Sequence, residues 1–371
     1  MAALFLIAWP AFAQTRMTVA EMQKELARLG QQREREAAPR LARFEMTERI
    51  SPARLSRWEL RFKGEIARQI LLYLADASSI RNLPAGEIPD APPPSELERS
   101  AILQRAREYV RSMRPRLPNF YALRSTISFE IATLNQMKSE QYELQFLEGS
   151  GKTLGFRSLG RVDSSRQLFL EGFSDERVTY RNGSEIQTPP ETQAKHRHLL
   201  PMGLTSAGEF GPILSLVDKD TAAGSIAWDR WEHGPSGLLA VYRYSVPADK
   251  SHFAFFQPSQ SVPGLSYEQH PAYHGELAVD PATGSVLRIV IEAAPPKSSA
   301  PADTPVVAAI VVEYGSVEIG GKNYVCPLHA IAINRIDEET GQTRPALPRI
   351  LVNDVTFTRY HLFRAEMRIL P

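Results

Sequence analysis

The chain has only one cysteine, Cys326, in 371 residues. A single cysteine cannot form a disulfide within the chain, so a disulfide-stapled scaffold is excluded and stability must come from burial of apolar side chains. Cys326 stands in the apolar, β-prone run Tyr324 to Leu328, and free cysteines are among the most buried residue types. We therefore predict a buried strand position for Cys326 and no role as a nucleophile.

The chain also lacks an excess of charge, because 43 Lys and Arg residues stand against 42 Asp and Glu residues, a formal net charge of +1. Without an overall field of one sign, attraction to nucleic acid or to an anionic membrane is not expected. The charges are nevertheless unevenly placed. Arg and Glu alternate densely from 16 to 116, and the later part is richer in Val, Ile, Tyr, Gly and Pro. This shift predicts a domain boundary near residue 117.

The apolar run at the start, residues 1–13, is shorter than the ~20 residues of a membrane-spanning helix. It ends in Ala11-Phe12-Ala13, the small-x-small pattern that precedes cleavage by signal peptidase. We predict a signal peptide over 1–13, a mature chain from Gln14 without an integral membrane segment, and a periplasmic or secreted location. Because the first basic residue is Arg16, we expect the basic segment of the signal to lie upstream of Met1.

The common catalytic and nucleotide-binding motifs are missing. No Gly-x-Ser-x-Gly run is present, which removes the usual nucleophile turn of an α/β-hydrolase. The run 149–153, Gly-Ser-Gly-Lys-Thr, lacks the first glycine of a phosphate-binding loop, because Phe146 stands there, and it predicts a hairpin turn. Asp218-Lys219-Asp220 resembles the start of a calcium loop, but Ala223 occupies the position that needs glycine, so we predict a solvated turn.

Histidine pairs are the remaining metal candidates. His270 and His274 are four residues apart, but Pro271 between them argues against a helix that would align them. His196 and His198 would share one face of a strand. Hydrogen-bonded surface or loop histidines explain both pairs more simply, so we assign no metal site, no cofactor and no catalytic residue.

Residues 14–117 predict a small helical module. Thr18-Val19-Ala20-Glu21 and Ser95-Glu96-Leu97-Glu98 have the capping-box pattern that begins a helix. Five prolines between residues 84 and 94 predict an extended surface loop. Apolar side chains at helical spacing predict the helices themselves: Val19 to Leu29, a second that carries Leu41 and Phe44 towards Ile50, a third after Ser51-Pro52, Ile66 to Ala77, and Ile102 to Met113.

Residues 118–371 predict an antiparallel β domain. From Arg124 polar and apolar residues alternate, and Asn182-Gly183 between two such runs is a strong hairpin signal. Two further hairpins are expected around the turns 234–237 and 281–284, and later strands over 306–314, 324–333 and 350–369. The fold class is therefore α+β, a small helical module followed by an antiparallel sheet or open half-barrel.

Aromatic residues are concentrated on the expected strands that follow residue 225. They form either the packed core of the sheet or the lining of an apolar cavity, and both possibilities stay open. The candidate ligand-binding residues are Trp228, Trp231, Tyr242, Tyr244, Phe255 and Phe256.

Several runs resemble a family of uncharacterised exported proteins of the acidobacterial type: 74–78, 117–120, 228–232, 275–284, 312–315 and 360–364. The resemblance implies no activity, so no functional residue is transferred from it. The strand, Asp-Pro-x-x-Gly turn and strand from Gly275 to Glu292 are also similar to a hairpin of periplasmic lipoprotein carriers. In those carriers a curved antiparallel sheet holds acyl chains under a helical lid, which implies a similar sheet here.

The failure of each catalytic motif favours a non-catalytic role. The leading hypothesis is an exported envelope protein that binds an apolar ligand or a protein partner through its β domain, with no nucleic-acid partner. One alternative is an exported hydrolase that uses scattered Asp, Glu and His residues, which sequence order cannot assemble. The other is a structural or interaction module whose helices form the partner surface.

Overall fold

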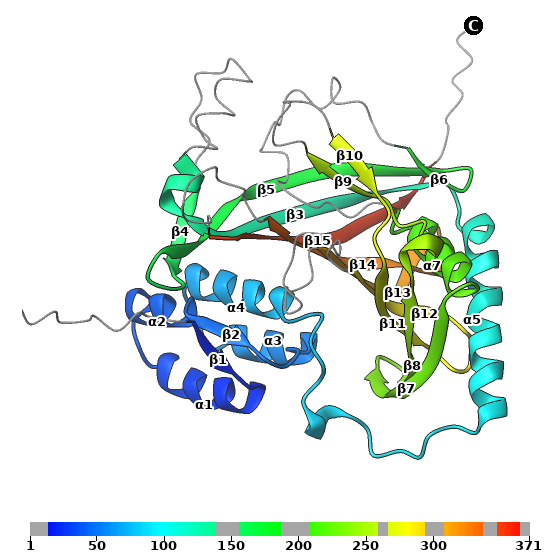
Figure 1. Cartoon of the computed structure of the whole chain (residues 1–371), viewed down its shortest axis with the longest axis horizontal. Coiled ribbons are helices and arrows are strands. Elements are labelled where there is room, and N and C mark those ends of the chain that lie inside the picture. The colour runs from blue at the N-terminus through cyan, green and yellow to red at the C-terminus, as the bar shows by residue number, and fades with distance from the viewer. Residues whose placement is uncertain are drawn as a thin grey trace, which may run out of the picture. The chain divides into compact units, whose positions relative to one another are not determined.

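The computed structural model describes residues 14–138, 156–186, 208–258, 266–293, 308–336 and 347–363 (Figure 1). The predicted signal peptide, the run 149–153, His196 and His198 lie outside these residues. The chain divides into two compact units, and each is described separately. Unit 1 contains Met1–Asn82, Phe129–Glu171 and Asp337–Ile350, and unit 2 contains Leu83–Ser128, Gly172–Ile336 and Leu351–Pro371.

The predicted fold class is confirmed, because helices precede a large, open antiparallel sheet. Its strand order is β4-β5-β3-β15-β14-β13-β12-β11-β8-β7, and β6 pairs with β5 off this path. The strands are β3 (Phe120–Thr133), β4 (Arg157–Arg161), β5 (Arg166–Arg181), β6 (Ser184–Ile186), β7 (Ser225–Gly234), β8 (Gly237–Val246), β11 (Tyr273–Val279), β12 (Val286–Ala293), β13 (Ala308–Ile319), β14 (Lys322–Ile336) and β15 (Arg349–Leu362). A separate hairpin pairs β9 (Phe255–Pro258) with β10 (Ser266–Gln269).

The helices of unit 1 before Asn82 are α1 (Val19–Leu29), α2 (Glu34–Leu41), α3 (Pro52–Glu59) and α4 (Glu65–Ala77). The predicted capping box begins α1, since the Thr18 hydroxyl accepts from Glu21 N and the Glu21 carboxylate accepts from Thr18 N. One sequence prediction is wrong here. The second helix ends at Leu41, and Phe44–Met46 forms β2, which pairs in parallel with β1 (Thr15–Met17) and buries alternate side chains.

Unit 2 is built on the long helix α5 (Glu96–Arg116), which lies along one face of β8, β11 and β12 (Figure 1). Its predicted capping box is present at Ser95 and Glu98. A narrow stripe of α5 is buried in the core, namely Ile102, Ala106, Val110 and Met113. This stripe packs α5 against the sheet within unit 2.

The three hairpins expected from the turn residues are confirmed by the pairings β5–β6, β7–β8 and β11–β12. Asn182 and Gly183 form the first turn with φ values of 52° and 76°, the left-handed conformation that Asn-Gly turns supply. Cys326 is buried, as predicted, in the core cluster of unit 2. Among the described residues, no helix has both the length and the apolar character needed to cross a membrane.

Candidate functional site

A pocket of about 690 Å³ lies at the C-terminal end of α5 in unit 2. This volume is within the usual range for small-molecule sites. The walls come from the end of α5, the link to β3, the β5–β6 turn, and helix α7 (Pro212–Thr221). The lining residues are Val110, Arg111, Arg114, Pro115, Leu117, Pro118, Asn119, Asn182, Gly183 and Ser215.

The chain is held in place around the pocket by bonds to the β5–β6 turn. Asn182 N donates to Asn119 Oδ1 at 2.9 Å, which fixes the turn against the residue that precedes β3. The Tyr180 hydroxyl, on β5, donates to the Arg114 carbonyl at 3.3 Å and so links the last turn of α5 to β5. Both walls are therefore set by the fold before any ligand is present.

Arg114 is the most constrained side chain of the pocket. Its Nε and Nη2 donate to the Gly183 carbonyl at 3.2 and 2.8 Å. On the other side it packs on Gly211, where a Cβ would lie 2.6 Å from Arg114 Cγ and where φ is 126°. A substitution at Gly211 would therefore displace Arg114.

Arg111 is the second cation of the pocket, and its side chain is 71% exposed. Its Nε lies 3.5 Å from Asp218 Oδ2, and Arg107, one turn earlier, has its Nε 3.7 Å from Asp218 Oδ1. Among the described residues, the pocket lining includes two guanidinium groups and no Asp, Glu, His or Cys. Such a lining offers hydrogen-bond donors to an anion.

Two carboxylates lie beyond the same β5–β6 turn. Glu209 has no exposed side-chain surface, and its Oε1 lies 3.5 Å from Arg124 Nη2. Glu185 pairs with Tyr180 in the β5–β6 register. Burial, and secondly the charge of Glu209, raise the pKa of Glu185 to about 7, against the opposing charge of Arg124 and a backbone hydrogen bond from Gly208. Glu185 therefore exchanges its proton near neutral pH.

A second polar cluster joins α7 to the strands. The Asp220 carboxylate accepts from His252 N and from the Tyr273 hydroxyl, both at 2.8 Å, and lies 2.6 Å from His252 Nδ1. The prediction of a solvated turn over 218–220 is wrong, because these residues form the end of α7 and Asp220 is buried. A carboxylate that binds Nδ1 orients the imidazole and directs Nε2 away from it.

The aromatic residues singled out by the sequence pack under α5. The Trp228 ring lies 4.8 Å from that of Trp231 and 6.1 Å from that of Tyr242, and the Tyr242 hydroxyl donates to the Arg99 carbonyl at 2.7 Å. Tyr244 is fully enclosed and donates to the Val290 carbonyl at 2.6 Å.

All four residues, Trp228, Trp231, Tyr242 and Tyr244, lie in or against the hydrophobic core. Phe255 and Phe256 belong to β9, but their side chains lie outside the part of the chain that the structure describes. The role of these six residues in ligand binding stays a prediction.

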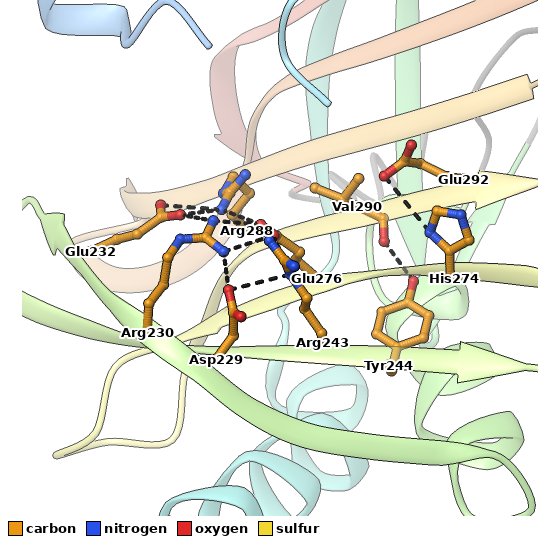
Figure 2. Close-up of polar contacts among 10 residues, drawn as sticks. All are labelled: Asp229, Arg230, Glu232, Arg243, Tyr244, His274, Glu276, Arg288, Val290 and Glu292. Atoms are coloured by element: carbon orange, nitrogen blue, oxygen red, sulfur yellow. Dashed lines mark hydrogen bonds and ion pairs between the residues drawn. The ribbon is translucent and has the colours of Figure 1, made fainter. Parts of the chain in front are cut away.

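The opposite face of the same strands carries a network of charged residues that the sequence did not indicate (Figure 2). Three arginines and three carboxylates alternate across β7, β8, β11 and β12. Arg230 contacts Asp229, Glu232 and Glu276, and Arg288 contacts Glu232 and Glu276. Arg243 completes the network through Asp229 and Glu276.

The structure describes one of the two candidate metal-binding pairs, His270 and His274, and these two residues do not share a helix or a strand. His270 follows β10 and lies 3.4 Å from Glu268, and His274 on β11 lies 3.9 Å from Glu292 (Figure 2). Burial, together with the charge of Arg243, lowers the pKa of His274. Each histidine thus has a carboxylate neighbour of its own.

Comparison of the chain with protein-family models, with curated proteins and with solved structures finds no match.

Proposed function

We propose that the chain is a non-catalytic binding protein whose unit 2 takes up a small molecule with one acidic group and an apolar part. The observation that carries this proposal is the composition of the pocket at the end of α5, which combines Arg111 and Arg114 with apolar side chains and no carboxylate. The predicted signal peptide supports an envelope or secreted location for this binding.

The two parts of the ligand follow from the two kinds of lining. Guanidinium groups form charge-assisted hydrogen bonds with carboxylate or phosphate oxygens. The amide of Asn119 and the hydroxyl of Ser215 add polar groups beside them. Val110, Leu117 and the neighbouring prolines favour an apolar body next to the acidic group.

Arg114 favours ligand binding through its fixed position as well as through its charge. Because Gly183 and Gly211 already hold the side chain, a ligand does not have to order it. The loss of side-chain freedom on binding is therefore small, and a larger share of the interaction energy appears as affinity.

The hydrolase alternative is favoured by one observation, the Asp220 and His252 pair. The Asp220 carboxylate holds Nδ1 of the His252 imidazole, and the His252 side chain is 54% exposed. This arrangement prepares Nε2 of His252 to accept a proton from water. An experiment separates the two functions. If the unsubstituted chain hydrolyses p-nitrophenyl esters and His252→Gln does not, the hydrolase function is supported. No turnover, with saturable acid binding, would support the binding role.

The binding proposal is tested by calorimetric titration of the full chain with decanoate and decyl phosphate, with decanol as the uncharged control. We expect saturable binding of at least one acid, weaker by about tenfold or more in Arg114→Gln, because one charge-assisted contact is lost. Arg105→Gln is the matched control, since it removes the same charge from α5 outside the pocket lining and likewise loses two bonds to the carbonyl of a turn residue, Pro281. Equal binding of decanol, equal weakening by Arg105→Gln, or no binding of either acid would overturn the proposal.

A further inference from the structure

Most of the exposed charged side chains between Gln14 and Asn82 in unit 1 are basic, although the whole chain is almost neutral. Between Gln14 and Asn82 three exposed side chains are acidic, namely Glu21, Glu36 and Glu65. Eleven are basic, namely Arg16, Lys24, Arg28, Arg33, Arg35, Arg40, Arg57, Arg61, Lys63, Arg68 and Arg81. The acidic residues that balance the total are partly buried or lie elsewhere in the chain.

Part of this basic surface is concentrated where four helix ends meet. A Cβ at Gly30 would lie 3.6 Å from Arg61 Cβ, so the end of α1 adjoins the segment after α3. A Cβ at Gly64 would touch the Glu34 carboxylate, so the start of α2 adjoins the start of α4. We call this surface the basic corner; its residues are Arg28, Arg33, Arg57, Leu60, Arg61 and Lys63.

Two nearby carboxylates, Glu34 and Glu25, do not cancel the charge of the basic corner. Glu34 Oε1 accepts from Ile66 N at 2.7 Å and from Ala67 N at 3.3 Å, so its charge is directed at the start of α4. Glu25 lies 3.4 Å from Arg28, whose own side chain remains 78% exposed. The field of the other basic side chains therefore reaches the solvent.

Leu60 belongs to the basic corner and is 87% exposed. In the sequence it stands between Arg57 and Arg61, with Lys63 three residues on. An exposed leucine among Arg and Lys is typical of a surface that lies on a membrane, where the apolar side chain enters the boundary of the acyl chains and the cations meet anionic headgroups. The aromatic neighbours Trp58 and Phe62 are 1% and 8% exposed, so they offer no stacking platform for nucleic-acid bases.

We infer that the basic corner docks unit 1 reversibly onto a bilayer that contains anionic lipid. Arg57, Arg61 and Lys63 contact the headgroups, and Leu60 inserts between them. This surface lies in unit 1 and does not depend on the pocket in unit 2, so either proposal can fail without the other.

The test is cosedimentation of the full chain with vesicles of phosphatidylglycerol and phosphatidylcholine, and with vesicles of phosphatidylcholine alone. We expect binding to the anionic vesicles only, with loss at high salt, because surface charges are screened over about 10 Å at 0.1 M ionic strength. Arg57→Gln with Arg61→Gln should weaken binding roughly 30-fold, since each cation near the surface contributes about fivefold.

Two matched controls separate docking from general charge. Arg16→Gln with Arg81→Gln removes the same charge from unit 1 beside Glu45, at the far end of α4, and should change binding little. Leu60→Ser should weaken binding about tenfold. Leu97→Ser, at an 82% exposed leucine between Glu96 and Glu98, should have no effect.

Several results would overturn the inference: no binding to anionic vesicles, equal binding to neutral vesicles, or equal loss in the two double variants. A DNA oligonucleotide or polyglutamate that binds tightly, with no effect of Leu60→Ser, would assign the corner to a different anionic partner. Melting temperatures of all variants show whether each is folded, so that a loss of binding is not a loss of structure.

Discussion

Arg230 on β7 binds both carboxylate oxygens of Glu276 on β11, with Nη1 2.8 Å from Oε1 and Nη2 2.9 Å from Oε2 (Figure 2). The two strands are not neighbours, because β8 lies between them in the sheet. Burial alone would lower the pKa of Arg230, but its bonds and charge interactions with Glu276, Glu232 and Asp229 outweigh this and hold it above the usual value. The network thus links β7, the last strand in the sheet order, to the inner strands β11 and β12.

Glu276→Gln tests this network. The substitution removes one carboxylate that faces Arg230, Arg243 and Arg288 and leaves partly buried positive charge with fewer partners. We expect a loss of about 2–3 kcal/mol in the free energy of unfolding, measured with urea. Glu318→Gln, at an exposed position on β13, should change it by less than about 0.5 kcal/mol. Equal effects of the two substitutions would contradict the role of the network.

A β-bulge explains why the network could not be read from the sequence. Trp228 pairs with Tyr242 and Arg230 with Val241, so Asp229 is the extra residue. Strict alternation from Trp228 would place Arg230 on the core side of β7, whereas the bulge reverses the sides and brings Trp231 to the core. Periodicity therefore located the strand correctly but could not assign its faces.

Short sequence patterns predicted correctly the features that depend only on neighbouring residues, such as helix starts and tight turns. The capping boxes at Thr18 and Ser95 begin helices, and Asn182-Gly183 forms a hairpin turn, because each signal acts over three or four residues. The burial of Asp220 depends on His252 and Tyr273, far along the chain, and a short charged run in isolation resembles a solvated turn. The pocket is likewise assembled from segments that are distant in sequence.

Asp220→Asn should loosen the segment that follows β8. Asparagine has one carbonyl oxygen in place of two carboxylate oxygens, so it cannot accept from His252 N, His252 Nδ1 and the Tyr273 hydroxyl together. We expect a loss of about 2 kcal/mol in stability, with faster hydrogen exchange over Ala248–Lys250. Asp249→Asn, at an exposed aspartate in the same segment, is the control. Unchanged exchange in Asp220→Asn would refute the anchoring role.

Trp228→Ala distinguishes a packed core from a ligand cavity. The Trp228 ring contacts the rings of Trp231 and Tyr242, and the Arg99 guanidinium carbon, Cζ, lies over it at 5.7 Å from the Trp228 ring centroid. A core role predicts a loss of about 2–3 kcal/mol in the free energy of unfolding. A cavity-lining role predicts a smaller loss together with weaker binding of decanol. Urea unfolding and calorimetric titration on the same preparation decide between the two outcomes.

The signal-peptide prediction is tested by expression with an added basic segment ahead of Met1 in an export-competent bacterium. We expect cleavage after Ala13, so the periplasmic or secreted product should begin at Gln14 by N-terminal sequencing. Ala11→Arg with Ala13→Arg removes the small side chains that signal peptidase requires and should block cleavage. An uncleaved cytoplasmic product from the unsubstituted sequence would exclude the predicted signal.

Glu185 should make unit 2 less stable as the pH rises towards neutrality. Because its pKa is raised to about 7 in the folded chain and lies near 4.3 in an unfolded one, the native state holds a proton that the unfolded state has released between these values. The stabilisation from this proton is complete below the lower value and is lost as the pH rises through the higher one.

Glu185→Gln should therefore flatten the dependence of the unfolding free energy on pH between about 4.5 and 7. At pH 8 the variant should be more stable than the unsubstituted chain by on the order of 1 kcal/mol, because it no longer carries a buried negative charge beside Glu209. Glu318→Gln should leave the pH profile unchanged. If Glu185→Gln instead lowers stability at pH 8, the carboxylate is stabilised as an anion, and Arg124 outweighs both burial and Glu209.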